Sequence, residues 1–261
     1  MKIAVCGAAG RMGQAIIGVA KVDGGVEIGG AFEYAGNPVV GQTICGIVID
    51  SVRNLDAEIS KSDVLIDFTS PESALSNLET ASKRKIPAVI GTTGFTLEQK
   101  EKIAQISKII PVVLSPNMSV GVNLLFKLVE EAAKAMPDYD IEIVELHHNK
   151  KKDAPSGTAA KLAECAALAR GKNIGEAAVY ARHGVIGERK KDEIGVMSVR
   201  AGDIVGDHTV YFAGPGETIE LTHRAHSRDT FAAGAVRAAK WLYGKSAGLY
   251  SMKDVLTAIE N

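Results

Sequence analysis

Two histidines, three lysines and a helix start lie close together in the segment 145–159. Histidine suits general acid catalysis because its unperturbed pKa is ~6.5, and lysine supplies a proton or a positive charge. Ser156 is placed to cap a helix whose first amides, at Gly157 and Thr158, can bind a carboxylate. The segment therefore predicts proton transfer to a small acidic substrate that is bound at the helix start.

His147, His148 and Lys151 are the candidates for handling protons in this segment. A solvated basic loop before an ordinary helix start is the alternative interpretation. Zinc binding is a weaker alternative, because the HExxH pattern is missing and the two histidines are adjacent. A second pair, His223 and His226, has no obvious carboxylate partner. The residue types alone leave a basic loop and a site as open interpretations, and no metal is expected.

A strand, a glycine turn and a helix are predicted at the start of the chain. The strand is predicted at residues 2–6, which are apolar after Lys2, and glycines follow at positions 7, 10 and 13 before a helical pattern that extends to about residue 20. Glycine lets a pyrophosphate approach the backbone and lets the helix pack tightly on the strand. The amides at the helix start then face the phosphates. A tight turn required only by packing would show the same glycines.

Glu33 supplies the context that the glycine turn lacks. The predicted strand 26–32 ends at Glu33, about 20 residues after Gly13, where a carboxylate can accept hydrogen bonds from an adenosine ribose. This favours dinucleotide binding over a structural turn. The next residue is Tyr34. A protein that binds the 2′-phosphate of NADPH would be expected to carry arginine at this position. We therefore expect NADH to be preferred, or NADH and NADPH both to be used, although Arg11 can still reach a phosphate.

Strands and helices continue to alternate through the first half of the chain. Buried strands are predicted at 63–67, 87–90 and 109–114, with helices after the first two. This alternation predicts an α/β fold with a Rossmann-type, doubly wound parallel sheet. Ligands of such sheets bind beyond the carboxyl ends of the strands. In this chain those ends carry Thr69, Gly91 to Thr93 and Ser115 to Met118.

The pattern changes after a helix predicted at 119–136. One further helix is predicted at 157–170, among strands at 140–146, 193–200, 207–213 and 218–225. A helix beside several neighbouring, mostly antiparallel strands predicts an α+β second domain with a mainly antiparallel or mixed sheet. Its open sheet suits pairing between subunits, so we expect an oligomer.

Two final helices, predicted at 229–243 and 252–260 with no strand between them, are expected to return to the first domain. The predicted domains are therefore 1–118 with 229–261, for the dinucleotide, and 119–228, for substrate binding and assembly into an oligomer.

Composition narrows the class of protein. The net charge is −1, with 30 Lys and Arg against 31 Asp and Glu, so no overall basic field indicates a nucleic-acid partner. The longest apolar runs are far shorter than the ~20 residues of a membrane span, and the start of the chain does not resemble a signal peptide. Cys6, Cys45 and Cys165 lack the spacing of a disulfide framework. We expect a soluble, cytoplasmic protein with reduced cysteines, a small-molecule substrate and no membrane partner.

Six motifs together resemble the dihydrodipicolinate reductase (4-hydroxy-tetrahydrodipicolinate reductase) family of the lysine and diaminopimelate pathway. They span nearly the whole chain: GAAGRMG at 7–13, DFTSPE at 67–72, GTTG at 91–94, PNMSVGVN at 116–123, ELHHNKKKDAPSGTA at 145–159, and RAGDIVGDHTVYFAGPGETIELTHRAHSRDTFAAGA at 200–235.

The resemblance implies a Rossmann domain, a substrate domain that closes on it, and a homotetramer assembled through the sheets of the second domain. It also implies hydride transfer from NADH or NADPH to a conjugated cyclic imine derived from 4-hydroxy-tetrahydrodipicolinate, with loss of water, to give tetrahydrodipicolinate. Some family members carry arginine directly after the ribose-binding acid. Tyr34 in this chain departs from that pattern and bears on the preferred cofactor.

The same resemblance implies roles for single residues. His147 matches the acid/base histidine and Lys151 the proton-donating lysine, while His148, Gly157 and Thr158 match substrate-binding residues. The positions that match cofactor contacts are Gly7, Ala8, Ala9, Gly10, Arg11, Met12, Glu33, Gly91, Thr92, Thr93, Ser115, Pro116, Asn117 and Met118.

Two other functions use the same dinucleotide-binding half. One is a dehydrogenase of an amino-acid-derived substrate, such as an aspartate dehydrogenase. The other is a nicotinamide-sensing protein without catalysis, which has no need of His147 with Lys151. The serine-capped helix start after two histidines favours a dicarboxylic ring over the substrate of such a dehydrogenase.

Overall fold

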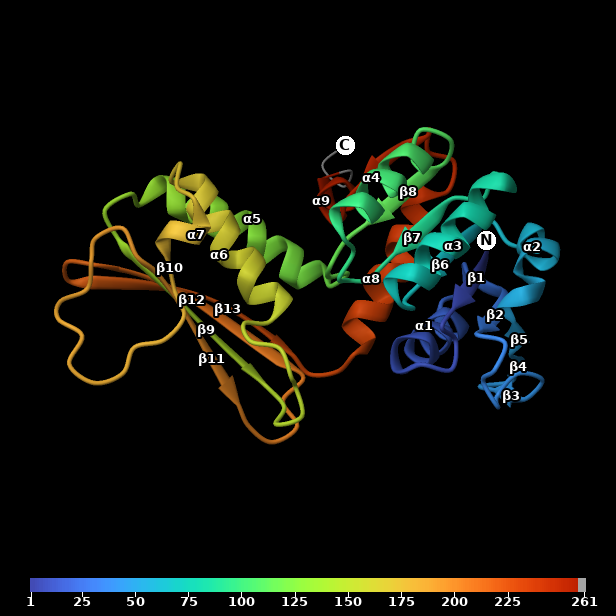
Figure 1. Cartoon of the computed structure of the whole chain (residues 1–261), viewed down its shortest axis with the longest axis horizontal. Coiled ribbons are helices and arrows are strands. Elements are labelled where there is room, and N and C mark those ends of the chain that lie inside the picture. Colours follow the sequence, from blue (N-terminus) through green and yellow to red (C-terminus); the bar gives the residue numbers. More distant parts are fainter. Residues whose placement is uncertain (258–261) are drawn as a thin grey trace. The chain divides into compact units, whose positions relative to one another are not determined.

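The structure is a computed structural model, and it describes residues 1–257 (Figure 1). The chain divides into two compact units. One consists of Met1–Val120 together with the segment that begins at Arg228, and the other is Gly121–Ser227. No helix within residues 1–257 is long and apolar enough to cross a membrane.

The first unit contains a seven-stranded sheet in the order β14-β8-β7-β6-β1-β2-β5, and every neighbouring pair runs parallel. The doubly wound parallel sheet predicted from the alternating pattern is confirmed. The strands are β1 (Lys2–Cys6), β2 (Glu27–Glu33), β5 (Asp50–Ser51), β6 (Val64–Asp67), β7 (Ala88–Ile90), β8 (Pro111–Leu114) and β14 (Gly248–Tyr250).

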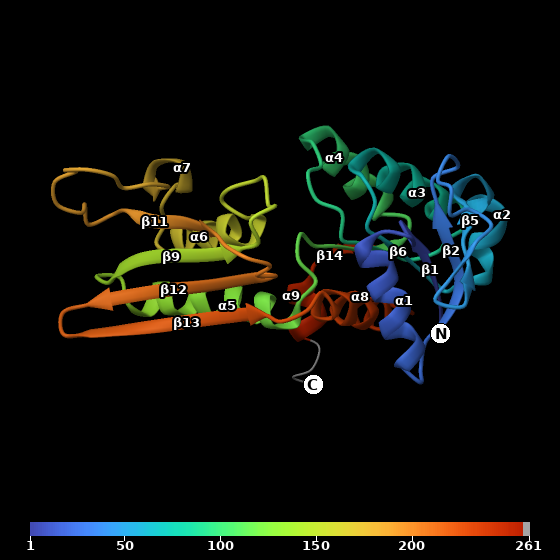
Figure 2. The ribbon, with the colours of Figure 1, turned by 90° about the horizontal axis from the view of Figure 1, so that it is seen from below.

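Both faces of this sheet are covered by helices, as the buried apolar residues of the central strands β6, β7 and β8 require. Along β1, Ile3 and Val5 belong to the core under α1 (Arg11–Val22) and α8 (Asp229–Leu242). Ala4 and Cys6 point the other way, into the core under α3 (Pro71–Lys83) and α4 (Leu97–Ile106). Figure 2 shows the two pairs of helices on opposite sides of the strands. Successive side chains of a strand alternate in direction, so one short strand contributes to two cores.

The helix starts in this unit follow local sequence signals. Ser70 caps α3 by accepting a hydrogen bond from the amide of Ser73, with Pro71 in the first turn. Thr96 and Gln99 form a capping box at the start of α4. Between β2 and β6 lie further short elements that no sequence pattern indicated: β3 (Thr43–Ile44), β4 (Ile47–Val48), η1 (Val52–Asn54), α2 (Leu55–Glu58) and η2 (Ile59–Lys61).

One prediction about the end of the chain is wrong. A strand, β14, does lie between α8 and the last helix, α9 (Met252–Thr257), and it pairs in parallel with β8. Three residues are too few to show a periodic pattern, and pairing with β8 decides their conformation. The rest of the helix predicted at 252–260 lies outside the described residues.

The second unit contains a five-stranded sheet in the order β10-β11-β9-β12-β13. β10, β11 and β9 run parallel, whereas β9, β12 and β13 run antiparallel, so the sheet is mixed rather than mostly antiparallel. The strands are β9 (Asp140–His147), β10 (Ala178–Val179), β11 (Ile194–Arg200), β12 (Gly206–Gly214) and β13 (Glu217–Ala225).

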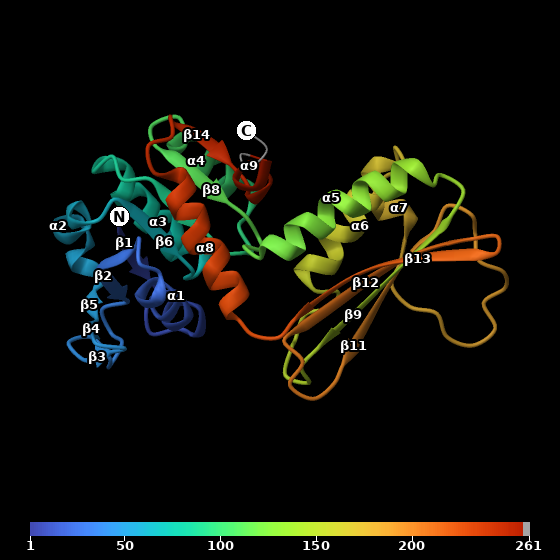
Figure 3. The same ribbon diagram turned by 180° about the vertical axis from the view of Figure 1, so that it is seen from behind.

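Helices α5 (Val120–Ala135) and α6 (Gly157–Ala169) cover one face of this sheet, followed by the short α7 (Ile174–Ala177). Figure 3 shows α5 and α6 on the same side of the strands. Their apolar residues pack on Ile141 and Ile143 of β9, Val196 of β11 and Phe212 of β12. The second core is thus a layer of helices on a single sheet face.

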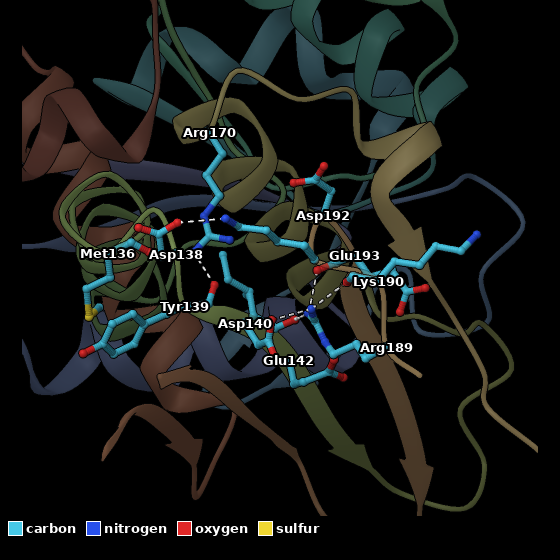
Figure 4. A network of polar contacts seen from close by, with 12 residues as sticks. Met136, Asp138, Tyr139, Asp140, Glu142, Arg170, Arg189, Lys190, Asp192 and Glu193 are labelled. Carbon is cyan, nitrogen blue, oxygen red and sulfur yellow. Dashed lines mark hydrogen bonds and ion pairs between the residues drawn. The ribbon is translucent and has the colours of Figure 1, made fainter. Parts of the chain in front are cut away.

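A polar network ties the loop between β10 and β11 to the start of β9 (Figure 4). Arg189 donates to Oε1 of Glu142 at 2.9 Å and to Oδ1 of Asp140 at 2.7 Å. Arg182 binds both carboxylate oxygens of Glu142, at 2.8 and 2.9 Å. Arg170, which follows α6, donates to the carbonyl of Tyr139 at 2.6 Å. These contacts hold the loop without a hydrophobic core of its own.

Candidate active site

The site in the second unit is built by a change from apolar to polar residues along one sheet face. In β9, Ile141 and Ile143 face the helices, and Glu145 and His147 continue the same face toward the end of the strand. The alternation places these side chains together because residues two apart share a face. A charged and a titratable side chain therefore follow directly on the apolar core.

Neighbouring strands add polar side chains at the same end. Ser198 of β11 pairs in register with Glu145, and Arg200 pairs with His147. On the other side, His208 of β12 pairs with Glu145. Residues paired in register project to the same face of a sheet, so three strands bring these groups together.

Glu145 is the most enclosed of them, with 0% of its surface exposed. Its Oε1 accepts hydrogen bonds from Nη2 of Arg200 at 2.9 Å and from the amide of Ser156 at 3.1 Å. Its Oε2 accepts from Nη1 of Arg200 at 2.9 Å and also contacts Nδ1 of His147. Burial alone raises the pKa of Glu145, but hydrogen bonds from Arg200, Ser198 and His147 prevail and lower it to about 2. The carboxylate is therefore ionised at neutral pH.

His147 is 9% exposed, and burial lowers its pKa, although the hydrogen bond and charge of Glu145 oppose that effect. The ring of His208 stands edge-on to it, with centroids 5.2 Å apart. Burial, followed by the charge of His147, lowers the pKa of His208 to about 3. Nε2 of His208 lies 3.0 Å from Oγ of Ser156. His208 is therefore uncharged at neutral pH.

Ser156 caps α6 as its position in the sequence predicts. Its Oγ accepts a hydrogen bond from the amide of Ala159 at 3.1 Å. Gly157 is exposed and Thr158 half-buried, and both lie in the first turn of this 13-residue helix. A helix start of this kind attracts anions because its amides point outward and the helix dipole is positive there.

Lys151 and His148 lie at the junction between β9 and α6. The ammonium group of Lys151, whose side chain is 19% exposed, donates to both carboxylate oxygens of Asp153 at 2.9 and 2.8 Å. The amide of His148 donates to the carbonyl of Ile204 at 2.8 Å. Nδ1 of the His148 ring is buried and has no hydrogen-bond partner among residues 1–257. A buried ring nitrogen without a partner favours a ligand there, because such a group is costly to leave unsatisfied.

The first unit has its own pocket, of about 370 Å³, at the carboxyl ends of its strands. Three of the predicted cofactor residues, Gly7, Gly10 and Glu33, line it together with Tyr34. Its volume is within the range of small-molecule sites. Thr69, which lies at one of the strand ends where a ligand was expected, also lines the pocket. The other lining residues were not predicted to contact a ligand: Cys6, Phe32, Val52, Phe68, Ser70, Ser73 and Asn77.

The carboxylate of Glu33 is held in place by its neighbours. Oε1 accepts from the amide of Ala9 at 3.1 Å, and Oε2 accepts from Nδ2 of Asn37 at 3.1 Å and from the amide of Tyr34 at 3.3 Å. The acid predicted from its spacing after the glycines is thus bonded directly to the glycine turn. Its position suits hydrogen bonds from a ribose.

The glycine turn needs glycine at two positions for different reasons. Gly7 has a φ of +76°, in the left-handed region that favours glycine. At Gly13, a Cβ would stand 2.2 Å from the carbonyl oxygen of Gly7, so α1 packs against the turn only without a side chain. Both features fit a dinucleotide, whose pyrophosphate needs the same close approach.

A buried carboxylate behind the pocket joins three segments. Asp67, at the end of β6, accepts hydrogen bonds from Nδ2 of Asn77 at 2.8 Å and from the amide and hydroxyl of Thr69 at 2.9 and 2.7 Å. The hydroxyl of Thr92 lies 3.3 Å from it. Burial raises the pKa of Asp67 against these hydrogen bonds. The predicted contact residue Thr92 is therefore positioned through Asp67.

The other predicted cofactor residues lie in the same unit. Ser115 donates to the carbonyl of Asn117 at 2.8 Å, and Met118 is buried against α8, where a Cβ on Gly234 would stand 1.8 Å from its carbonyl oxygen. Ala8 and Thr92 are buried, and Arg11, Thr93 and Pro116 are exposed. The half-buried ones are Ala9, Met12, Gly91 and Asn117.

Some residues at the two sites were not predicted to have a role. They are Glu145, Arg200 and His208 in the second unit, and Asp67 and Asn77 in the first. A signal existed for Glu145, because a carboxylate on the buried face of an alternating strand is unusual and needs a partner. Nothing local pointed to Arg200 or His208, which reach the site through strand register.

Comparisons with known proteins agree with this architecture. Residues 1–118 match the family profile "Dihydrodipicolinate reductase, N-terminus", and residues 121–256 match "Dihydrodipicolinate reductase, C-terminus". Relatives named 4-hydroxy-tetrahydrodipicolinate reductase, from Trichlorobacter lovleyi and Geotalea daltonii, are 55% and 52% identical over 98% of both chains. A dipicolinate-bound dihydrodipicolinate reductase from Paenisporosarcina sp. TG-14 has a TM-score of 0.79 at 26% identity, over 96% of this chain and 97% of that one.

Proposed function

This chain belongs to the dihydrodipicolinate reductase family, and on that premise we propose that it is an NAD(P)H-dependent 4-hydroxy-tetrahydrodipicolinate reductase. It reduces 4-hydroxy-tetrahydrodipicolinate to tetrahydrodipicolinate with loss of water, in lysine biosynthesis through the diaminopimelate pathway. The observation that carries the proposal is the junction of a buried imidazole and a serine-capped helix start through one carboxylate, Glu145. Glu145 thus places a group that can transfer a proton beside a site that can bind an anion.

The helix start of α6 is the proposed seat for a substrate carboxylate. Gly157 and Thr158 present amides in its first turn, and the start of a helix attracts anions because the helix dipole is positive there. His148 contributes a buried Nδ1 without a hydrogen-bond partner within residues 1–257. A dicarboxylate ring suits a seat with several donors better than a neutral substrate does.

His147 and Lys151 are the proposed groups for proton transfer. His147 acts as the acid/base residue, held by Glu145. Lys151 acts as a proton donor, held on the loop after β9 by its ion pair with Asp153. These two roles divide between an enclosed imidazole and a more accessible ammonium group.

The first unit is the proposed dinucleotide-binding domain. A nicotinamide dinucleotide supplies the hydride when it is bound. Glu33 is oriented for the adenosine ribose, and the glycine turn allows the backbone to approach the pyrophosphate. We propose that NADH is preferred or that both dinucleotides are used, because Tyr34 stands where an arginine would neutralise a 2′-phosphate and Glu33 would repel that phosphate.

The second unit is the proposed domain for substrate binding and tetramerisation. Only one face of its sheet is covered by α5 and α6 within the described chain, so the other face suits pairing between subunits. A homotetramer in the cytoplasm completes the proposal. Sedimentation equilibrium tests the oligomeric state, and cell fractionation tests the location.

A coupled enzyme assay tests the proposed reduction. Aspartate semialdehyde and pyruvate are condensed enzymatically, and the purified chain is added with NADH or NADPH. We expect dinucleotide oxidation that depends on the condensation product. Absence of oxidation with both dinucleotides contradicts the proposal, and oxidation with an amino-acid-derived substrate alone favours the dehydrogenase alternative.

A further inference from the structure

We infer that Glu145 is a positioning residue for His147: it holds the proton on Nδ1 and leaves Nε2 as the nitrogen that meets the substrate. The inference rests on the proposed function for the identity of the reaction, and it adds a role for a residue that no sequence motif assigned. Glu145 is buried on β9 beside the imidazole of His147, and in this inference it does not touch the substrate.

The tautomer of His147 follows from the hydrogen-bond inventory around Glu145. An ionised carboxylate only accepts hydrogen bonds, so Nδ1 of His147 must be the donor in the contact with Oε2. In the neutral imidazole a proton on Nδ1 leaves Nε2 as an acceptor, and in the charged imidazole Nε2 carries the transferable proton. Glu145 thereby directs proton transfer through one ring nitrogen.

The same carboxylate couples the imidazole to the carboxylate seat. One oxygen of Glu145 accepts from the amide of Ser156, the cap of α6, while the other contacts His147. Arg200 crosses from β11 to bind both oxygens, at 2.9 Å each, and also donates to the carbonyl of Asp153 at 2.7 Å. A substrate carboxylate at the first turn of α6 is thus held at a set position relative to the imidazole.

Glu145 differs from the other groups around His147 in its effect on the pKa of that imidazole. Lys151, on the loop after β9, and Arg200, on β11, both lower the pKa of His147, as does burial. His208 faces the ring from β12 and is uncharged at neutral pH, and α6 contributes the neutral Ser156. Glu145 is the group that raises the pKa of His147. Loss of its charge should therefore shift protonation of His147 to lower pH.

Glutamine cannot replace Glu145 without conflict. Glu145 accepts two hydrogen bonds from Arg200 and one each from Ser156 and His147, and Ser198 donates a further one. The amide group of a glutamine would point its own N–H groups at Arg200 and at either His147 or Ser156, which leaves donors facing donors. Aspartate keeps the charge and the acceptors but is one methylene shorter.

A matched control lies on the same strand. Glu142 of β9 is also bound by arginines, Arg182 and Arg189, but it faces the opposite side of the sheet from Glu145. Glu142→Gln therefore removes an arginine-bound carboxylate from β9 without touching His147. It reports what the loss of such a carboxylate does to stability alone.

The experiment compares the wild type with Glu145→Gln, Glu145→Asp and Glu142→Gln. Nitrogen NMR of histidine-labelled protein gives the tautomer and the protonation midpoint of His147, and steady-state assays give kcat and KM across pH. We expect a proton on Nδ1 in the wild type. In Glu145→Gln the midpoint moves to lower pH and kcat falls ~10²-fold with KM for NADH nearly unchanged. Glu145→Asp should recover part of kcat, and Glu142→Gln should lower only the melting temperature.

Each outcome decides the inference. A wild-type imidazole protonated on Nε2 overturns it even where no variant folds. Equal losses of kcat in Glu145→Gln and Glu142→Gln, at equal losses of melting temperature, also overturn it because they indicate a structural role. If the wild type does not reduce the expected substrate, the proposed function fails, whereas the NMR result still decides whether Glu145 positions His147.

Discussion

Gly206 lies directly against the imidazole of His147: a Cβ at position 206 would stand 3.0 Å from Nε2. This is closer than carbon and nitrogen atoms approach without displacement of one of them. Since Glu145 occupies the other side of the ring, at Nδ1, the ring is confined from both ends. Glycine at position 206 leaves room beside the nitrogen that we propose to meet the substrate.

Gly206→Ala should therefore lower kcat while the fold persists. The methyl group pushes the ring of His147 by a few tenths of an ångström or takes the space of a substrate atom. We expect kcat to fall ~10-fold, equivalent to about 1.4 kcal/mol in the barrier. Steady-state kinetics with a fluorescence titration of NADH checks this. Unchanged kcat would show that the space beside Nε2 is not used.

His147→Gln and Lys151→Ala should each reduce kcat by ~10²-fold or more, because each removes a group that transfers a proton. The Kd for NADH should stay nearly constant, since the dinucleotide residues belong to the first unit. Lys150→Ala is the control, as Lys150 is an exposed lysine next to Lys151 without a proposed role. Near-normal turnover in both variants would remove the assigned roles.

Gly13→Ala and Gly18→Ala should change stability in opposite directions, although both lie in α1. At Gly13 a Cβ meets the carbonyl oxygen of Gly7 at 2.2 Å, whereas at Gly18 nothing lies within 4 Å. Gly18→Ala should raise the free energy of unfolding by about 0.5–1 kcal/mol, from helix propensity alone. Gly13→Ala should lower it and weaken NADH binding. Urea unfolding and NADH titration measure both, and stabilisation by Gly13→Ala would contradict the close packing of the turn.

Tyr34→Arg should move the cofactor preference toward NADPH. Tyr34 is exposed, follows Glu33 and lines the pocket of the first unit, so an arginine there can pair with a 2′-phosphate. We expect the ratio of kcat/KM for NADPH to that for NADH to rise ~10-fold. Tyr34→Phe, which adds no charge, should leave the ratio unchanged. A ratio that does not move in Tyr34→Arg would place the phosphate elsewhere.

Acid should destabilise the protein through groups whose pKa is lower when folded, and two of them, His208 and Glu145, have large decreases. The pKa of His208 is lowered by burial from 6.5 to about 3, so its contribution to stability is complete above 6.5 and is lost as pH falls toward 3. Glu145, with a pKa lowered from 4.5 to about 2, loses its contribution only below 4.5. The first loss on acidification therefore comes from histidine.

His208→Gln should isolate that first loss. Between about pH 7 and about pH 5, the wild type should lose roughly 2 kcal/mol of unfolding free energy to protonation of His208, and the variant should lose that much less. Urea unfolding at the two pH values measures the difference. Identical pH dependence in both proteins would mean that His208 becomes charged without unfolding.

The local features of this protein follow from its amino-acid sequence. Spacing along a few residues is enough to predict the glycine turn before α1, the carboxylate of Glu33, the serine cap of α6 and the alternation of β9. These features are local because turn conformation, helix capping and the direction of strand side chains depend on near neighbours. The order of strands and helices determined the parallel sheet of the first unit for the same reason.

The tertiary structure alone decided the partners of these features. Arg200 and His208 meet Glu145 through the register of β11 and β12 with β9, and β14 exists because it pairs with β8. Register depends on which strands lie side by side and on how their buried faces align, and neither is encoded in a short segment. The chemical character of His147 was therefore readable from the chain, whereas the carboxylate and guanidinium that hold it required the folded sheet.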